Sequence, residues 1–181
     1  MSGTAADVAP QIVWQGQYVT AITEGRWEYV NRARNIRAAV ILAIDDAPDG
    51  RHIILVEQYR VPLHRHCIEL PAGLVGDEEA GEAPSIAAAR ELEEETGYRA
   101  ENWQEAGEFC SSPGMVGESF TLMIARDLTR IGPGGGVSNE DIIVHRVPLS
   151  GITEFLEAQR ALGRAIDVRL TMLLAPTWLA Q

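Results

Sequence analysis

The chain has 181 residues and a mass of 19.8 kDa, a length typical of one domain with a buried core. Its 46% hydrophobic and 23% charged residues exclude a disordered tail, a collagen-like repeat and a disulfide scaffold. The 15 basic and 26 acidic residues give a net charge of −11, which excludes the basic surface of a protein that binds nucleic acid or an anionic membrane. An anionic substrate would therefore need a bound cation to offset the repulsion.

Cysteine usage and the N-terminal residues indicate a compartment. Cys67 and Cys110 match no paired metal-ligand or redox spacing, so we expect both to be reduced and buried. No apolar run is long enough to cross a bilayer, and the first residues have neither the basic start nor the apolar stretch of a secretory signal. We therefore expect a cytoplasmic protein.

The N-terminal part of the chain predicts β-structure. Residues 17–34 mix β-branched and aromatic residues with charges around a glycine turn, which predicts a hairpin of half-exposed strands. Residues 37–45 and 52–59 predict two apolar strands joined by a turn at residues 45–50. A shorter strand is expected at residues 67–70, followed by a loop rich in glycine and acidic residues.

The clearest predicted helix begins at Pro84 and covers residues 85–96. Proline suits the first helical turn, the segment is rich in helix formers, and Gly97 lies where a left-handed C-terminal cap belongs. Strands are expected near residues 103–109, 119–125 and 142–148, with loops at residues 111–117 and 132–139 between them. Helices at residues 152–162 and 168–175 close the chain.

The predicted helix carries four glutamates, of which three share one face. At about 100° per residue, Glu94 and Glu95 lie within about 60° of Glu91, whereas Glu93 points to the opposite side. Like charges within one turn repel, so this face costs stability unless a cation compensates it. Carboxylate clusters suit Mg²⁺ or Mn²⁺. The alternative is an acidic face that is simply exposed to solvent.

The helix is part of a longer motif. From Gly76 the chain reads glycine, five residues, Glu82, seven residues, and then the run Arg90-Glu91-Leu92-Glu93-Glu94-Glu95-Thr96-Gly97-Tyr98. This pattern resembles the signature box of the Nudix hydrolases. The resemblance implies a mixed α/β fold, an α/β/α sandwich around a mixed sheet, in which the box forms a loop, a helix and a loop that hold divalent cations.

The resemblance also implies a metal centre. Glu91, Glu94 and Glu95 would be the metal ligands, with the carbonyl of Ala72 as a further ligand and Glu94 counted among the catalytic residues. The expected cation is Mg²⁺, for which Mn²⁺ can substitute. Such cations neutralise a pyrophosphate, polarise phosphorus and activate a water molecule.

Other positions of the box have structural roles in the family. By resemblance, Glu82 and Arg90 would pair to hold the loop against the helix, and Gly97 would end the helix. Two residues separate the Pro-Ala-Gly triplet, which ends at Gly73, from Gly76. Either Gly73 or Gly76 therefore takes the place of the first glycine of the box.

A loop beyond the box is similar to the ADP-ribose pyrophosphatase subfamily. Pro113 lies fifteen residues beyond Tyr98, and the Ser-Pro-Gly loop that contains Pro113 and Gly114 leads to Glu118. The resemblance makes Glu118 the base that deprotonates the attacking water, and it places Pro113 and Gly114 at the substrate. A carboxylate on a loop suits this role, since loop closure brings it to the water only when substrate is bound.

Two upstream residues are similar to substrate-binding positions of the same subfamily. Arg60 would contact phosphate or ribose, because its guanidinium fork matches phosphate oxygens. Trp27 would stack on the adenine, often across a dimer interface. The alternatives are an ion pair at the end of a strand for Arg60 and a place in the core of the hairpin for Trp27.

The combined expectation is a Mg²⁺-dependent homodimer that splits ADP-ribose into AMP and ribose 5-phosphate. Residues 1–35 would be a hairpin region for dimerisation and base binding, and residues 36–181 the hydrolase domain. Two alternatives remain: the hydrolysis of GDP-mannose or another nucleotide sugar, and a non-catalytic module that senses a nucleotide. We expect no nucleic-acid or membrane partner.

Overall fold

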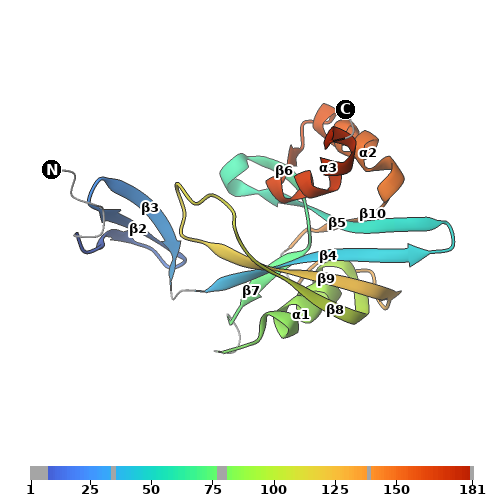
Figure 1. Ribbon diagram of the computed structural model, residues 1–181, viewed down its shortest axis with the longest axis horizontal. Helices are drawn as coiled ribbons and strands as arrows, with labels where there is room; N and C mark the ends of the chain where they lie inside the picture. The colour runs from blue at the N-terminus through green and yellow to red at the C-terminus, as the bar shows by residue number, and fades with distance from the viewer. Residues whose placement is uncertain (1–7, 34–35, 77–80, 138–139, 180–181) are drawn as a thin grey trace.

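The computed structural model describes residues 8–33, 36–76, 81–137 and 140–179, and the strands form two sheets. The smaller sheet is antiparallel and contains β1 (Gln11–Gln15), β2 (Val19–Glu24) and β3 (Trp27–Arg32). Figure 1 shows it to one side of the other elements. The predicted hairpin is present as β2 and β3, but β1 was not predicted. All five residues of β1 are exposed, so no pattern of burial marked it as a strand.

The larger sheet is mixed. Its strands are β4 (Arg37–Ala47), β5 (Gly50–Arg60), β6 (Arg65–Glu69), β7 (Ala72–Val75), β8 (Tyr98–Cys110), β9 (Ser119–Arg130), β10 (Ile143–Pro148) and β11 (Ala165–Ile166). The main order is β11-β6-β5-β4-β9-β8, while β10 pairs with β5 and β7 with β4. The β4–β9 and β11–β6 pairs are parallel and the others are antiparallel.

The loop predicted after the Pro-Ala-Gly triplet is wrong in its first residues. Ala72–Val75 form β7, which pairs with β4 from Arg37↔Val75 to Val40↔Ala72. β4 is long enough to pair with β7 at its start and with β5 at its end. This pairing brings β7 beside the acidic helix. Arg34, residues 1–7 and residues 138–139, which belong to predicted segments, lie outside the described residues.

Helices cover both faces of the larger sheet (Figure 1). α1 (Pro84–Thr96) lies on one face, while α2 (Ile152–Ala161) and α3 (Thr171–Leu179) lie on the other. Each face has its own buried apolar cluster, with Leu92 of α1 in one and Leu156 of α2 in the other. The predicted α/β/α architecture is therefore confirmed. α3 begins three residues later than predicted, because Val168–Leu170 form a 3₁₀ turn.

The prediction for the cysteines is only half correct. Both are free, and Cys67 is buried, where burial raises the pKa of its thiol to about 12. Cys110 is exposed, since it ends β8 at the edge of the sheet.

Among the described helices, none has the length and apolar character needed to cross a membrane.

Candidate active site

A cavity of about 570 Å³ lies beside α1 and takes residues from both ends of the chain. Its lining comes from β3, β4, β5, β7, α1 and β9, together with loops and the C-terminal turn at residues 167–169. Segments that are far apart in the sequence thus meet at one place, which is where a chemical site is expected.

One wall of the cavity is the face of α1 that carries Glu91, Glu94 and Glu95. Glu93 does not line the cavity and instead accepts hydrogen bonds from Nε and Nη2 of Arg99, at 2.6 and 3.0 Å. Three of the four glutamates therefore share the cavity side of the helix, as the helical period requires.

Hydrogen bonds orient these carboxylates. Glu95 is only 4% exposed, and its Oε2 accepts a hydrogen bond from the amide N of Ala72 at 3.0 Å. Nη1 of Arg90 donates to Oε1 of Glu91 at 2.9 Å and to Oε2 of Glu94 at 3.4 Å. Ala72 also lines the cavity, so β7 and α1 build this wall together.

Burial disfavours the charged form of two carboxyl groups of the acidic wall, the face of α1 that carries Glu91, Glu94 and Glu95. It raises the pKa of Glu95 to about 8, with the charges of Glu91 and Glu140 acting in the same direction and the amide of Ala72 acting against it. Burial also raises the pKa of Glu91, although the guanidinium of Arg90 opposes the effect. A cation placed beside these groups would relieve both penalties.

The donor set fits a hard divalent cation in its chemistry. The ligands on offer are carboxylate oxygens, which Mg²⁺ and Mn²⁺ prefer, and burial leaves them short of positive charge. Within the described part of the chain, no three His, Cys, Asp or Glu side chains converge on one point. In this arrangement the guanidinium of Arg90 is the positively charged group that contacts both Glu91 and Glu94.

The two glycines that were candidates for the box position have different surroundings. A Cβ atom on Gly73 would lie 1.9 Å from Cδ of Glu91, so the absence of a side chain there lets the carboxylate reach the cavity wall. Gly76 has φ +82° and its amide donates to Oε2 of Glu82 at 3.1 Å. Nε of Arg90 lies 3.7 Å from Oε1 of the same Glu82. Gly73 thus borders the acidic wall, while Gly76 turns the chain toward Glu82.

Glu118 lines the same cavity and forms an ion pair with Arg32 of β3. The backbone reinforces this contact, because Val30 donates to the carbonyl of Met115 and accepts from the amide of Gly117, both at 3.0 Å. The smaller sheet therefore holds the loop that leads to Glu118.

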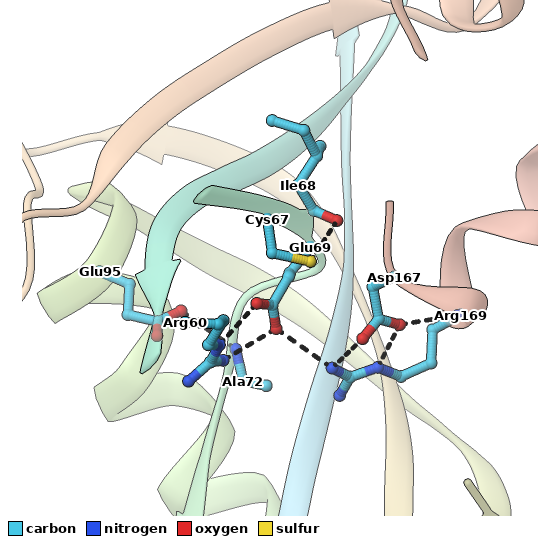
Figure 2. Close-up of polar contacts among 8 residues, drawn as sticks. All are labelled: Arg60, Cys67, Ile68, Glu69, Ala72, Glu95, Asp167 and Arg169. Atoms are coloured by element: carbon cyan, nitrogen blue, oxygen red, sulfur yellow. Dashed lines mark hydrogen bonds and ion pairs between the residues drawn. The ribbon is translucent and has the colours of Figure 1, made fainter. Parts of the chain in front are cut away.

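Another part of the lining carries Arg60 and Arg169. Figure 2 shows Arg60 and Arg169 on either side of Glu69. Nε and Nη2 of Arg60 donate to Glu69 at 2.6 and 2.8 Å, and Nη2 of Arg169 donates to the same carboxylate at 3.3 Å. Asp167 pairs with Arg169, and although burial alone would raise the pKa of Asp167, these hydrogen bonds lower it. Of the arginines here, only Arg60 was predicted.

Trp27, Pro113 and Gly114 do not line this cavity within one chain. Trp27 is 45% exposed at the start of β3, where it pairs with Glu24, and Pro113 and Gly114 are exposed in their loop. Their roles at the substrate stay predictions.

Several residues of the lining were not predicted. Arg32, Gln58, Glu140, Asp167 and Arg169 all reach the cavity. Arg32 lies in the same strand as Trp27, so the prediction that Trp27 contacts the substrate was the available signal for Arg32. Asp167 lies between the two predicted C-terminal helices and Arg169 lies within the second, where the structure has a 3₁₀ turn, so no local pattern marked either residue.

The site and fold define a class: a mixed α/β protein in which a carboxylate-bearing helix lines a cavity of about 570 Å³ that arginines also line. Residues 34–144 match the model of the NUDIX domain family. The chain therefore belongs to this family, as its signature box indicated.

Named relatives agree with this membership. The chain is 42% identical over 92 residues to an ADP-ribose pyrophosphatase of Bacillus subtilis, covering 51% of this chain and 46% of that protein. It is 36% identical over 134 residues to a GDP-mannose pyrophosphatase of Cronobacter sakazakii, covering 70% and 66%. The chain thus spans about half the length of the first relative and 66% of the second.

A solved structure has the same fold. The crystal structure of an ADP compounds hydrolase superposes with a TM-score of 0.65 at 22% identity, covering 95% of this chain and 92% of that one. The likeness therefore extends to the smaller N-terminal sheet and the C-terminal helices as well as the family segment.

Proposed function

We propose that this protein hydrolyses the pyrophosphate bond of a nucleoside diphosphate sugar in the presence of Mg²⁺, and that ADP-ribose is its substrate, giving AMP and ribose 5-phosphate. The observation that carries the proposal is a single cavity lined by the carboxylates of α1 and by arginines from other elements. A pyrophosphate needs both, since carboxylates recruit cations and guanidiniums donate directly to phosphate oxygens. The names of the two relatives favour a nucleotide sugar.

The acidic wall is the proposed cation site. Glu91, Glu94 and Glu95 would hold Mg²⁺, or Mn²⁺ in its place, with the carbonyl of Ala72 as a further ligand. When bound, such a cation neutralises charge on the pyrophosphate and makes phosphorus easier to attack. Glu95 would give up the proton that burial favours when it binds the cation.

The proposed base is Glu118. Its carboxylate accepts a proton from water as the water oxygen bonds to phosphorus, and the bond from phosphorus to the bridging oxygen breaks. The electron pair of that bond leaves with the departing phosphate. Arg60 donates to a phosphate oxygen and so holds the substrate in line.

The smaller sheet would complete the site in a homodimer. Trp27 is exposed and lies outside the cavity of its own chain, as a residue that stacks on the adenine in a partner's site would be. Residues 1–35 are therefore proposed as the dimerisation and base-binding region, and residues 36–181 as the hydrolase domain.

Product analysis tests the proposal. The purified chain is incubated with Mg²⁺ and separately with ADP-ribose or GDP-mannose, and the products are separated by chromatography. Release of AMP from ADP-ribose at the higher kcat/KM supports the proposal, whereas a preference for GDP-mannose favours the second substrate. Binding of both compounds with no product would instead favour a nucleotide sensor.

Two matched variants test the acidic wall. Glu94→Gln should keep the fold and lose most turnover, because it removes a charge from the cavity. Glu93→Gln changes the adjacent glutamate, which binds Arg99 away from the cavity, and should keep turnover. Equal activity in the two variants would contradict the assignment of the acidic wall.

A further inference from the structure

Arg169 reaches the cavity from the C-terminal segment and is held in one orientation. Asp167 accepts from Nε through Oδ1 and from Nη2 through Oδ2, both at 2.7 Å. The guanidinium carbon also lies 5.8 Å from the centre of the Phe120 ring. Asp167 is itself fixed, because its amide donates to the carbonyl of Ile68 at 3.0 Å beside the parallel β11–β6 pair. A guanidinium bound in this way has little freedom to turn.

Glu69 connects this fixed arginine to Arg60. Its side chain is only 4% exposed, and its carboxylate lies between the two guanidiniums (Figure 2). Oε1 accepts from Nε of Arg60, while Oε2 accepts from Nη2 of both arginines. A carboxylate buried this deeply depends on its cationic partners, so removal of one partner weakens the position of the whole group.

Arg60 depends on Glu69 for its own orientation. Among the described residues, the side-chain hydrogen bonds of Arg60 go to Glu69 alone, and 42% of its side chain is exposed at the cavity. Arg60, Arg169, Glu69 and Asp167 together carry two positive and two negative charges. Because this group has no net positive charge, attraction of a phosphate depends on where the remaining N–H donors of Arg60 point.

We propose that Arg169 is a positioning residue, which fixes Arg60 through Glu69 and so sets the affinity of the cavity for the phosphate of a nucleotide sugar. The proposal rests on the proposed function, since it takes Arg60 as a substrate-binding residue. Asp167 and Arg169 lie outside residues 34–144, the segment that matches the family model. The C-terminal segment thereby acts on substrate binding through a residue of the family segment.

Steady-state kinetics on ADP-ribose with Mg²⁺ test the chain of contacts. Arg60→Met and Arg169→Met should each raise KM about tenfold and leave kcat within about twofold. The double variant should be no worse than Arg60→Met, because both substitutions remove the same interaction. Arg169→Lys should recover part of the affinity, since an ammonium keeps the charge beside Glu69 without the two-point contact to Asp167.

Arg164→Met is the matched control. Arg164 belongs to the same segment, and its Nε donates to the buried Glu57 at 2.8 Å, but it does not line the cavity. It should lower the melting temperature as Arg169→Met does and leave KM unchanged. If Arg169→Met has the KM of wild type or of Arg164→Met, or if its effect adds to that of Arg60→Met, the positioning role is wrong.

Two further measurements keep the test decisive. If Arg169→Met does not fold, Arg169→Lys and Glu69→Gln provide the same comparison of KM with kcat. Calorimetric titration of all variants with ADP-ribose repeats the comparison without turnover. A wild-type chain that binds without cleaving would contradict the proposed hydrolysis and still test Arg169 through its Kd, whereas a chain that does neither overturns both proposals.

Discussion

The buried carboxyl of Glu95 makes a testable link between pH, metal and stability. In the metal-free protein burial raises the pKa of Glu95 from 4.5 to about 8, so the folded chain keeps a proton that the unfolded chain has lost. For an acid shifted in this direction, the stabilisation is complete below the ordinary pKa and is lost as pH rises toward the raised value. At about 1.4 kcal/mol per pH unit, the whole loss from well below pH 4.5 to well above pH 8 is about 5 kcal/mol.

The assay is urea unfolding in the presence of a chelator, followed by circular dichroism, at a series of pH values from about 5 to about 8. The Glu95→Gln variant keeps an oxygen for the amide of Ala72 but has no proton to lose. The stability of wild type relative to this variant should fall by about 4 kcal/mol over that range. At the upper end of this pH range, saturating Mg²⁺ should raise the free energy of unfolding of the wild-type protein and have less effect on that of the variant.

Parallel pH profiles for wild type and Glu95→Gln would refute this reasoning. The lower limit of the range avoids a group that titrates in the opposite direction. Burial alone would raise the pKa of Glu57, but the hydrogen bonds from Arg164 and His145 lower it. The stability that Glu57 contributes is therefore present above its ordinary pKa and is lost as pH falls below it.

Three further predictions follow from single side chains. Gly73→Ala should reduce turnover about tenfold or more with little change in melting temperature, because its Cβ would displace the carboxylate of Glu91. Gly76→Ala should keep turnover and lower the free energy of unfolding by about 1 kcal/mol, because Gly76 has a positive φ. Reversed effects of the two variants would contradict the distinction between the two glycines. Glu118→Gln should lower kcat by about 10² to 10⁴ and change KM little, and an unchanged kcat would show that another group is the base. Leu92→Ala should lower the free energy of unfolding by about 2 to 5 kcal/mol in urea titrations, since Leu92 is fully buried on the side of α1 that packs against the sheet, and a loss below about 1 kcal/mol would contradict that packing.

Features that depend on neighbouring residues were predictable from the sequence. As expected, α1 begins at Pro84 and ends at Gly97, which has a left-handed conformation. The period of the helix then determines that Glu91, Glu94 and Glu95 share a face, whatever the rest of the chain does. The apolar strands β4 and β5 were likewise recognisable, because strands buried on both faces form nearly continuous apolar runs.

The edges of the fold were harder to predict. β1 is wholly exposed, β11 has only two residues, and β7 is short and contains a glycine. Each is held as a strand by pairing with a partner that is distant in sequence or by its place in a small sheet. No local pattern marks such segments, so their strand character becomes apparent only when the sheet order is known.

The acidic helix, its caps and the family of the chain could be inferred without the structure, because all three depend on residue spacings within residues 76–98. The contacts between arginines and carboxylates elsewhere in the cavity became apparent only in the folded chain. The parallel β11–β6 pair brings Asp167 and Arg169 beside Glu69, about 100 residues away, and the pairing of Val30 with the 111–117 loop brings Arg32 to Glu118. Contacts of this kind arise from the order of strands in a sheet, which spacing along the chain does not encode.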